Sequence, residues 1–477
     1  MAPRSPRRSC DPESNNFARP SAATRAGPFA VWELALNAAL RSMVSGISEA
    51  ARGSLKRQCK LPPMNRNDTD ILIVGGGAAG MSAALAAASN SDFRVTVVDD
   101  NPQLGGQIWR AELGKTKSPE AVRLVEAIDR ERINIVNNAQ VFAECGDRSL
   151  AAEAPDGRIE FAYQKLIIAT GARERFLPFP GWTLPNVFGA GGLQALVKGG
   201  LNVNGKRVVV AGTGPLLLAV AHYLNAKGAR VLMIAEQVSA AVVRRFARGL
   251  WRFPAKMMEA AALRARLVGI KYMTDSWVTS AEGNAKLERI NILSKGKIRR
   301  VACDYLACGF HLVPNTELAE LLGCRIENGC VSVDDLQQTT VENTLCVGEP
   351  TGIAGVESSI VEGTIAGLVA SGQVDAARTH CAARDKANRF GTALNTAFGL
   401  RSELKTLADA ETIVCRCEDV QYSRLVDFDD FRTAKLQTRC GMGACQGRVC
   451  GPATEFLFGW KPDSVRPPIF PVKLENL

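Results

Sequence analysis

Two stretches of this chain run from a strand through a glycine-rich turn into a helix and on to a second strand. In the first, an apolar strand at 71–74 precedes a small-residue helix at 78–88 and a β-branched strand at 94–98. In the second, the corresponding segments are 207–211, 215–226 and 230–234. A strand–helix–strand crossover of this kind joins parallel strands. The pattern therefore predicts an α/β fold with two Rossmann-like dinucleotide-binding domains.

The first glycine loop matches the G-x-G-x-x-G pattern of dinucleotide-binding turns. Gly75 permits the tight turn, Gly77 lets a pyrophosphate approach the backbone, and Gly80 lets the helix pack on the strand. Ala78 and Ala79 begin the helix, where free N–H groups and the helix dipole favour phosphate. A lone loop of this kind is weak support for a nucleotide site, because the same pattern also occurs as a structural turn.

The segment after this loop supplies further candidate contacts. Asp99 ends the next strand, nineteen residues after Gly80, and is placed to accept hydrogen bonds from an adenosine ribose. Asp100 is the weaker candidate for the same role. Gly106 and Gln107 follow at the spacing found in flavoproteins.

Two later segments complete the pattern. An apolar strand ends in an Ala-Thr170-Gly171 turn, and a second strand at 345–347 ends in Gly348-Glu349 before a small-residue helix. With the first loop, these segments resemble the flavoproteins with two dinucleotide-binding domains, the glutathione-reductase-like fold. The resemblance implies that the loop, the acidic strand end and the late Gly-Glu segment hold FAD. Glu349 stands where that family has Asp, whose carboxylate binds the ribityl hydroxyls of the flavin, so the longer side chain shifts this contact.

The second glycine loop departs from the fingerprint. Gly212 and Gly214 keep the first two glycines, but Leu217 replaces the third, which predicts a wider spacing between strand and helix. Glu236 ends the next strand, where a carboxylate favours NAD over NADP, while three arginines at 244–248 leave room for a phosphate. The pattern leaves open NAD, ATP or an inherited fold with an idle site.

Five cysteines lie in the last part of the chain: Cys415, Cys417, Cys440, Cys445 and Cys450. Four thiolates suit an iron–sulfur cluster and also tetrahedral zinc, although the Cys-x-Cys spacing is awkward for zinc. The segment resembles bacterioferredoxin-associated-ferredoxin-like [2Fe–2S] domains. That resemblance implies Cys415, Cys417, Cys445 and Cys450 as the ligands and leaves Cys440 as a spare thiol. No cysteine pair follows either glycine loop, which disfavours a thiol–disulfide reductase.

Composition excludes several other classes. Residues 1–63 hold ten Lys or Arg and four Asp or Glu, so they carry +6 of the net +10 charge, and a nucleic-acid-binding face is poorly supported. The three histidines (His222, His311 and His380) are far apart in sequence, which makes a histidine metal site or a Ser–His–Asp triad improbable. No apolar run is long enough to span a membrane. Scattered cysteines in apolar contexts indicate a reducing, cytoplasmic compartment.

These observations divide the chain into six segments. Residues 1–63 are expected to be an unfolded extension. This extension is either a transit peptide or, as the preferred interpretation, a segment added because the start codon was assigned too far upstream. The others are an FAD-binding domain in two parts (64–190 and 305–372), a second nucleotide-binding domain (191–304), a linker (373–411) and the [2Fe–2S] domain (412–477).

The order of these segments carries a narrower resemblance. The stretches 309–318, 348–353 and 441–448 make the chain similar to the larger (α) subunits of bacterial amine-oxidising flavoprotein complexes, such as opine oxidase, D-hydroxyproline dehydrogenase, hydrogen cyanide synthase and heterotetrameric sarcosine oxidase. The resemblance implies a flavoprotein β partner, similar to D-amino-acid oxidase, that oxidises an amino acid or secondary amine. This chain would then relay the electrons through its cluster and FAD to an acceptor that no motif identifies.

Two other functions stay open at this stage. A self-contained NAD(P)H-dependent ferredoxin-type reductase would use the second loop for hydride transfer, and a non-catalytic subunit would hold a structural nucleotide there. No general base stands out in the sequence, so we expect no acid–base catalytic residue in this chain.

Overall fold

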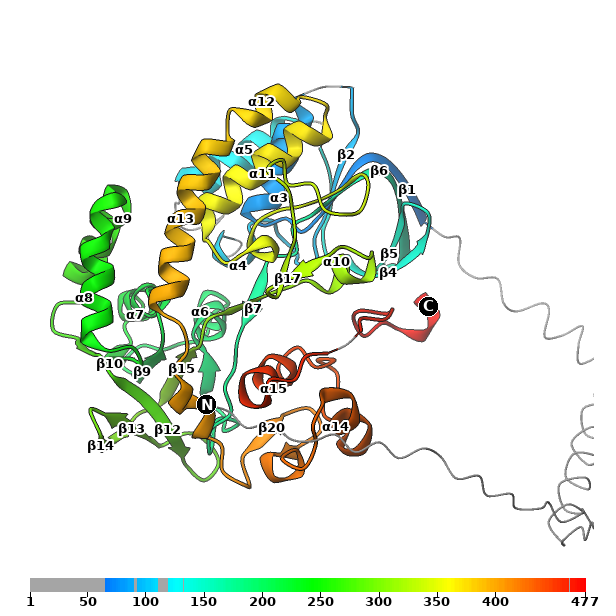
Figure 1. Ribbon diagram of the computed structural model, residues 1–477. Coiled ribbons are helices and arrows are strands. Elements are labelled where there is room, and N and C mark those ends of the chain that lie inside the picture. The colour runs from blue at the N-terminus through cyan, green and yellow to red at the C-terminus, as the bar shows by residue number, and fades with distance from the viewer. Residues whose placement is uncertain (1–64, 90–91, 110–118, 132, 463) are drawn as a thin grey trace, which may run out of the picture. The chain divides into compact units, whose positions relative to one another are not determined.

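A computed structural model describes residues 65–89, 92–109, 119–131, 133–462 and 464–477 (Figure 1). Residues Met64–Leu477 make up one compact unit. The expected extension at 1–63 lies outside the described residues.

The first sheet has seven strands in the order β3-β2-β1-β6-β5-β4, with β19 also pairing with β6. Its strands are β1 (Asn65–Val74), β2 (Val95–Val98), β3 (Ile133–Val136), β4 (Gln140–Gly146), β5 (Ser149–Ala154), β6 (Gly157–Ile168) and β19 (Thr344–Cys346). Strand β1 runs parallel to both β2 and β6, and β19 runs parallel to β6, as the glycine-loop pattern predicts. Because β19 comes from far downstream, the first nucleotide-binding domain is built from two separated parts of the chain.

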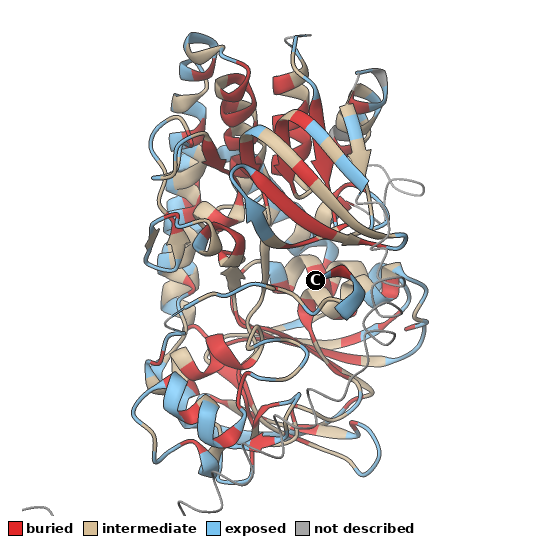
Figure 2. Ribbon diagram, turned by 90° about the vertical axis from the view of Figure 1, so that its right-hand side faces the viewer, coloured by how far each residue is buried: buried red, intermediate tan, exposed pale blue. Residues whose placement is uncertain are grey.

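Two helices pack closely on this sheet, α3 (Ala78–Ala88) and α11 (Val356–Ala370). Gly363 and Gly367 on α11 lie against the carbonyl oxygens of Ala79 and Ala83 on α3, with no room for a Cβ atom at either glycine. The short α4 (Gly106–Trp109) and α5 (Pro119–Arg130) complete this layer. Figure 2 shows that buried residues concentrate in the strands and in the helices beside them.

The second sheet has five strands in the order β11-β10-β9-β15-β8. They are β8 (Val187–Gly189), β9 (Arg207–Gly212), β10 (Arg230–Glu236), β11 (Lys271–Met273) and β15 (Tyr305–Gly309). Its helices are α6 (Ala190–Lys198), α7 (Leu216–Ala226), α8 (Ala240–Gly249), η1 (Leu250–Arg252) and α9 (Pro254–Arg266). The second domain therefore extends beyond the expected 191–304, because β8 and β15 form backbone hydrogen bonds with its sheet rather than with the first.

Smaller elements join these two sheets. A three-stranded antiparallel sheet is formed by β12 (Ser276–Glu282), β13 (Arg289–Ser294) and β14 (Lys297–Ala302). Strands β7 (Ala172–Glu174) and β16 (Leu312–Pro314) pair antiparallel between the two nucleotide-binding domains. The remaining elements are α10 (Glu317–Leu321), β17 (Ile326–Glu327), β18 (Cys330–Val331) and η2 (Glu349–Thr351).

The segment expected to be a linker, 373–411, contains helices. It contains α12 (Val374–Arg378), α13 (Cys381–Ala397) and η3 (Ser402–Thr406). Gly391 of α13 packs directly on Ala354, and Asn395 donates a hydrogen bond to the Ile353 carbonyl at 2.8 Å. In Figure 1, α13 runs from α12 toward the second domain.

The cysteine-rich module has its own small core. Its elements are β20 (Ile413–Cys415), β21 (Val420–Gln421), η4 (Tyr422–Arg424), α14 (Phe431–Thr438) and α15 (Cys450–Phe458). The module therefore ends before the expected 477, because Ile469 belongs to the core of the first sheet and η5 (Leu474–Asn476) hydrogen-bonds to β5 and β6. Val414, Leu425 and Phe431 pack with three of the cysteines in this core. Across the described residues, no helix combines the length and the apolar character that a membrane crossing needs.

Candidate functional site

The first glycine loop lies at the carboxyl ends of β1 and β2. Gly80 touches the Gly75 carbonyl, which leaves no space for a side chain and brings α3 onto β1. Among the described residues, the nearest heavy atom to a Cβ built on Gly77 is the Gly106 Cα at 3.9 Å. The structure thus brings the predicted residues Gly75, Gly77, Gly80 and Gly106 together around a space that a pyrophosphate could enter.

Asp99 lies beside this loop and is almost fully buried. One of its carboxylate oxygens accepts a hydrogen bond from the Gly76 N–H, and the other accepts from the Asn101 N–H at 2.8 Å. Asp100 is exposed and its carboxylate meets the Asn101 side chain instead. The geometry therefore favours Asp99 over Asp100 as the acidic residue of the site.

Two further predicted segments reach the same edge of the sheet. Thr170 follows β6 and donates a hydrogen bond to the Asn315 carbonyl at 2.7 Å, and the Asn315 amide returns one to Thr170 at 2.8 Å. Gly348 follows β19, and its N–H donates to the Glu362 carboxylate at 2.8 Å. Because β6 and β19 are parallel neighbours, their carboxyl ends place both turns beside the glycine loop.

Glu349 carries the clearest sign that a ligand belongs here. Its Oε1 accepts from the Gly355 N–H at 3.1 Å, whereas its Oε2 is shielded from solvent and has no hydrogen-bond partner among the described residues. Burial raises the pKa of this carboxyl to about 7. A buried acceptor of this kind needs a donor, and a ligand hydroxyl supplies one. The residues present thus fit a flavin cofactor with a polyol chain.

The second glycine loop is built differently. Gly214 donates its N–H to Glu236 at 2.7 Å, and the other Glu236 oxygen accepts from the Val238 N–H at 3.1 Å. Burial raises the pKa of Glu236 to about 7. The Thr213 hydroxyl donates to the Phe398 carbonyl at 2.9 Å. The predicted residues Gly212, Gly214 and Glu236 are adjacent as expected, and the Phe398 side chain lies 3.8 Å from a Cβ built on Gly214.

The five cysteines gather in the C-terminal module. The sulfurs of Cys415, Cys440 and Cys450 all lie within 4.8 Å of one another and are buried. Cys417 hydrogen-bonds to the backbone and the side chain of Cys445 and interacts electrostatically with Cys415. Hydrogen bonds from the Cys440 and Cys450 thiols lower the pKa of Cys415 to about 2. Such a group of sulfurs can hold an iron–sulfur cluster or a zinc ion.

The predicted ligand set takes two members from each of these cysteine groups. Cys440, expected to be a spare thiol, sits in the buried group, so five sulfurs are available for four ligand positions. Gly443 passes directly over the Cys417 Cβ, so any side chain at that position would displace this cysteine. Spacing in the sequence does not separate Cys440 from the other candidates, because its spacing to Cys445 equals the spacing from Cys445 to Cys450.

Polar side chains that the sequence did not single out connect the module to the first domain. Arg173, in β7, donates to the Arg448 carbonyl at 3.2 Å and pairs with Glu317 at 2.8 Å. It also donates to the Asn315 side chain at 2.8 Å, the residue that holds Thr170. Trp182 adds a hydrogen bond to the Ile413 carbonyl at 2.6 Å. The segment 445–448 is therefore linked to the Thr170 turn through two intervening side chains.

Comparison with known proteins identifies the family. The family model for the pyridine nucleotide-disulphide oxidoreductases matches residues 69–367. The chain belongs to this family. Membership makes it an FAD-type oxidoreductase and implies binding of FAD and a nucleotide.

Individual relatives define the subunit family more closely. The chain is 30% identical to the hydrogen cyanide synthase subunit HcnB of Pseudomonas protegens, over 80% of this chain and 89% of the relative. It is 29% identical to the A subunit of opine oxidase from Rhizobium meliloti, over 86% of this chain and 87% of the relative. The expected place of this oxidoreductase in the family of these two subunits is confirmed.

A solved structure supports the fold. The L-proline dehydrogenase of P. horikoshii superposes with a TM-score of 0.61 at 19% identity, covering 87% of this chain and 80% of that chain. At this identity the likeness concerns the fold alone.

Proposed function

We propose that this oxidoreductase is the electron-relay subunit of a complex that oxidises an amino acid or a secondary amine. The observation that carries the proposal is the hydrogen-bonded link from the cysteine module to the flavin-type site, which runs from the Arg448 carbonyl through Arg173 and Asn315 to Thr170. In this proposal Cys415, Cys417, Cys445 and Cys450 hold a [2Fe–2S] cluster, and the loop at 75–80 with Asp99, Thr170 and Glu349 holds FAD. When bound, the cluster carries one electron and the FAD carries two.

In this proposal the residues of this chain bind and position the cofactors. The first glycine loop and the helix dipole of α3 position the phosphates. Glu349 accepts a hydroxyl hydrogen bond, and Arg173 keeps the cysteine module against the Thr170 turn. We assign no acid–base catalytic residue to this chain, because in the proposal a partner subunit oxidises the C–N bond.

The partner is proposed to be a flavoprotein like D-amino-acid oxidase, and the substrate an opine, D-hydroxyproline or a similar amine. The names of two relatives support a partner, since HcnB and the opine oxidase relative are both named as subunits. A reducing, cytoplasmic setting agrees with the twelve described cysteines, all of which are free thiols.

Anaerobic spectroscopy tests the relay. The full chain, with FAD and iron–sulfide restored, is expected to show flavin and cluster absorption together, and both should respond to a chemical reductant. Addition of NADH should leave both unchanged. Bleaching of the flavin by NADH would instead establish the reductase alternative, and metal analysis showing zinc without iron would refute the cluster.

A variant tests the link between the two sites. Arg173→Gln removes the ion pair to Glu317 and the hydrogen bond to the Arg448 carbonyl. We expect slower electron exchange between flavin and cluster after a light-triggered reduction, with cofactor content unchanged. Arg299→Gln, on the exposed strand β14, is the matched control and should exchange electrons at the wild-type rate. Equal rates in the two variants would contradict the proposed contact.

A further inference from the structure

The second glycine loop is covered by a short segment of the connector between the domains. This segment, Phe398–Arg401, follows α13 and precedes η3. The Phe398 carbonyl accepts from the Thr213 hydroxyl at 2.9 Å and lies 2.6 Å from His311 Nε2. The Phe398 side chain lies 3.8 Å from a Cβ built on Gly214, so its ring sits over the turn where a pyrophosphate would approach.

Gln237 fastens the segment to the loop from the other side. Its amide nitrogen donates to the Thr213 hydroxyl at 3.0 Å and to the Gly399 carbonyl at 2.8 Å. Its amide oxygen accepts from the Arg401 N–H at 3.1 Å. Gln237 is fully buried and every polar atom of its amide group is engaged, which makes this contact part of the folded core rather than a surface encounter.

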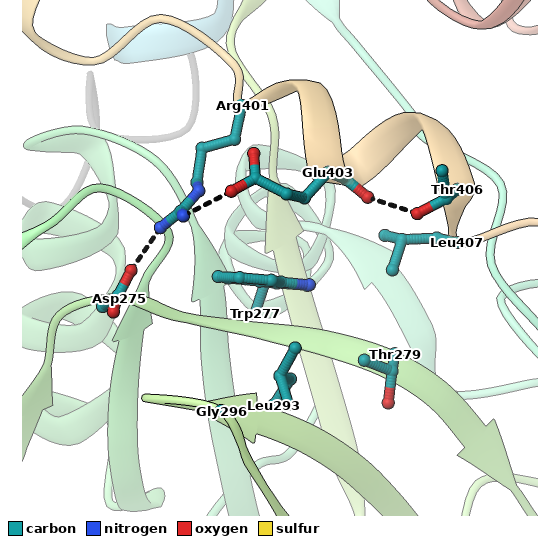
Figure 3. A pocket seen from close by; sticks show the side chains of 9 residues that line it. All are labelled: Asp275, Trp277, Thr279, Leu293, Gly296, Arg401, Glu403, Thr406 and Leu407. Carbon is teal, nitrogen blue, oxygen red and sulfur yellow. Dashed lines mark hydrogen bonds and ion pairs between the residues drawn. The ribbon is translucent and has the colours of Figure 1, made fainter.

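Arg401 anchors the end of the segment on the second domain. Figure 3 shows its guanidinium group between Asp275 and Glu403, above the ring of Trp277. The guanidinium carbon lies 4.6 Å from the centre of that ring, and Nη1 also donates to the Gln237 carbonyl at 3.1 Å. These contacts hold the segment at both ends.

Aromatic rings brace the other face of the segment. Phe246 of α8 meets Phe398 edge-on at 5.0 Å between ring centres and lies 6.4 Å from Phe390 of α13. Phe253 meets Phe390 at 5.3 Å. Because α13 also packs on Ala354 of the first domain, the helix and its C-terminal segment form a continuous brace from one nucleotide-binding domain to the other.

A dinucleotide could not use this loop without removing the segment. Its pyrophosphate would meet the Phe398 side chain over Gly214, and the carbonyl oxygens of Phe398 and Gly399 are held there by the Thr213 hydroxyl and the Gln237 amide. Glu236 accepts backbone N–H groups on both carboxylate oxygens just as Asp99 does at the first loop, so the acidic residues do not distinguish the two loops. At the first loop the difference is the absence of a side chain such as that of Phe398: no side-chain atom of the described residues lies within 4 Å of a Cβ built on Gly77, and the nearest atom there is the backbone Gly106 Cα at 3.9 Å.

We propose that Phe398–Arg401 seals the second glycine loop, so that this chain binds neither a nicotinamide nor an adenine nucleotide there. The seal also determines electron-donor specificity, because the flavin cannot be reduced by hydride transfer from a nucleotide bound at this loop. This inference departs from what family membership implies for the second domain, and it holds whether or not the chain is a relay.

Binding of ADP-ribose tests the seal without any redox step. Calorimetric titration of the full, FAD-loaded chain is expected to show no saturation up to about 1 mM ADP-ribose, which is weaker than ordinary cofactor binding. The variant Gln237→Ala loses the fastening contacts, so its affinity should rise at least about tenfold. The control Gln421→Ala, on the exposed end of β21, should behave as wild type.

The outcomes are distinct from those for the relay, because ADP-ribose carries no electrons. Saturable binding to the wild type below about 100 µM would overturn the seal. A folded Gln237→Ala variant without gain in affinity would overturn it too, since the loop itself would then exclude the ligand. If that variant does not fold, the test rests on two measurements of the wild type. One is the titration, and the other is amide hydrogen exchange at 398–401, which should stay slow and unchanged by ADP-ribose.

Discussion

The contact between α3 and α11 gives a prediction that can be worked out from the structure. A Cβ atom on Gly363 would lie closer than 3.0 Å to the Ala79 carbonyl oxygen, 3.0 Å from its carbon and 3.1 Å from Ser82 Cβ. Most of these atoms are backbone or near it, so no flexible side chain can move aside. Gly363→Ala should therefore push the helices apart and lower the free energy of unfolding by about 1–3 kcal/mol, the usual cost of overpacking.

The same variant should weaken flavin binding. Helix α3 carries Ala78, Ala79 and Gly80, the predicted phosphate-binding positions, so its displacement moves them away from the ligand. We expect roughly tenfold weaker FAD retention, which corresponds to about 1.4 kcal/mol. Urea denaturation followed by circular dichroism measures stability, and flavin absorbance after gel filtration measures retention.

The matched control is Gly249→Ala. Gly249 ends the exposed helix α8, and no atom lies within 4 Å of a Cβ built there. Alanine at this position should be neutral or stabilise by up to about 1 kcal/mol, because it favours the helix. A Gly363→Ala protein with wild-type stability and full flavin would refute the reasoning about close packing.

Three further predictions concern single side chains. In the flavin-free chain, the carboxyl pKa of Glu349 rises from 4.5 to about 7 on folding, so its contribution to stability is present below pH 4.5 and is lost as the pH rises to 7. In Glu349→Gln the change in the free energy of unfolding between pH 5 and pH 8 should be smaller than in the wild type by at most about 3 kcal/mol, as measured by denaturation curves at the two pH values. An equal change in both proteins would count against this prediction. Cys445→Ser should lose the cluster signal in electron paramagnetic resonance, whereas Cys440→Ser should keep it; loss of the signal in Cys440→Ser would move the ligand set to the buried group. Arg448→Met should lower the stability of the cysteine-rich module by about 1–2 kcal/mol, because the Arg448 guanidinium group stacks on Phe470 at 4.0 Å and donates a hydrogen bond to the Ile469 carbonyl. Faster proteolysis after β20 measures this loss.

Local patterns were sufficient for much of the fold and of the first site. The helix predicted at 78–88 is α3, and the strands predicted around both glycine loops are β1, β2, β9 and β10. These elements can be predicted from the sequence because strand, turn and helix are contiguous and the local backbone conformation requires each glycine. The adjacency of the loop, the Thr170 turn and the Gly348 turn also followed, since parallel strands bring their carboxyl ends to one edge.

Contacts between distant segments were not readable in the same way. The sequence contains Phe398, Gln237 and Arg401, but nothing in their local surroundings says that they meet at the second loop. The same holds for Arg173 and Arg448, which are 275 positions apart. Cys440 could be placed among the ligands or outside them, because spacing alone does not orient a thiol.

The sequence by itself determined the α/β class, the first nucleotide cradle and the presence of a thiolate cluster, because these depend on short stretches whose residues meet through local geometry. Only the tertiary structure decided that the second loop is covered and that the cysteine module contacts the Thr170 turn. The physical reason is that both depend on contacts between segments that are distant in the sequence and meet only when the chain folds. Packing of Phe398 and the burial of Gln237 exist only when the whole chain is assembled.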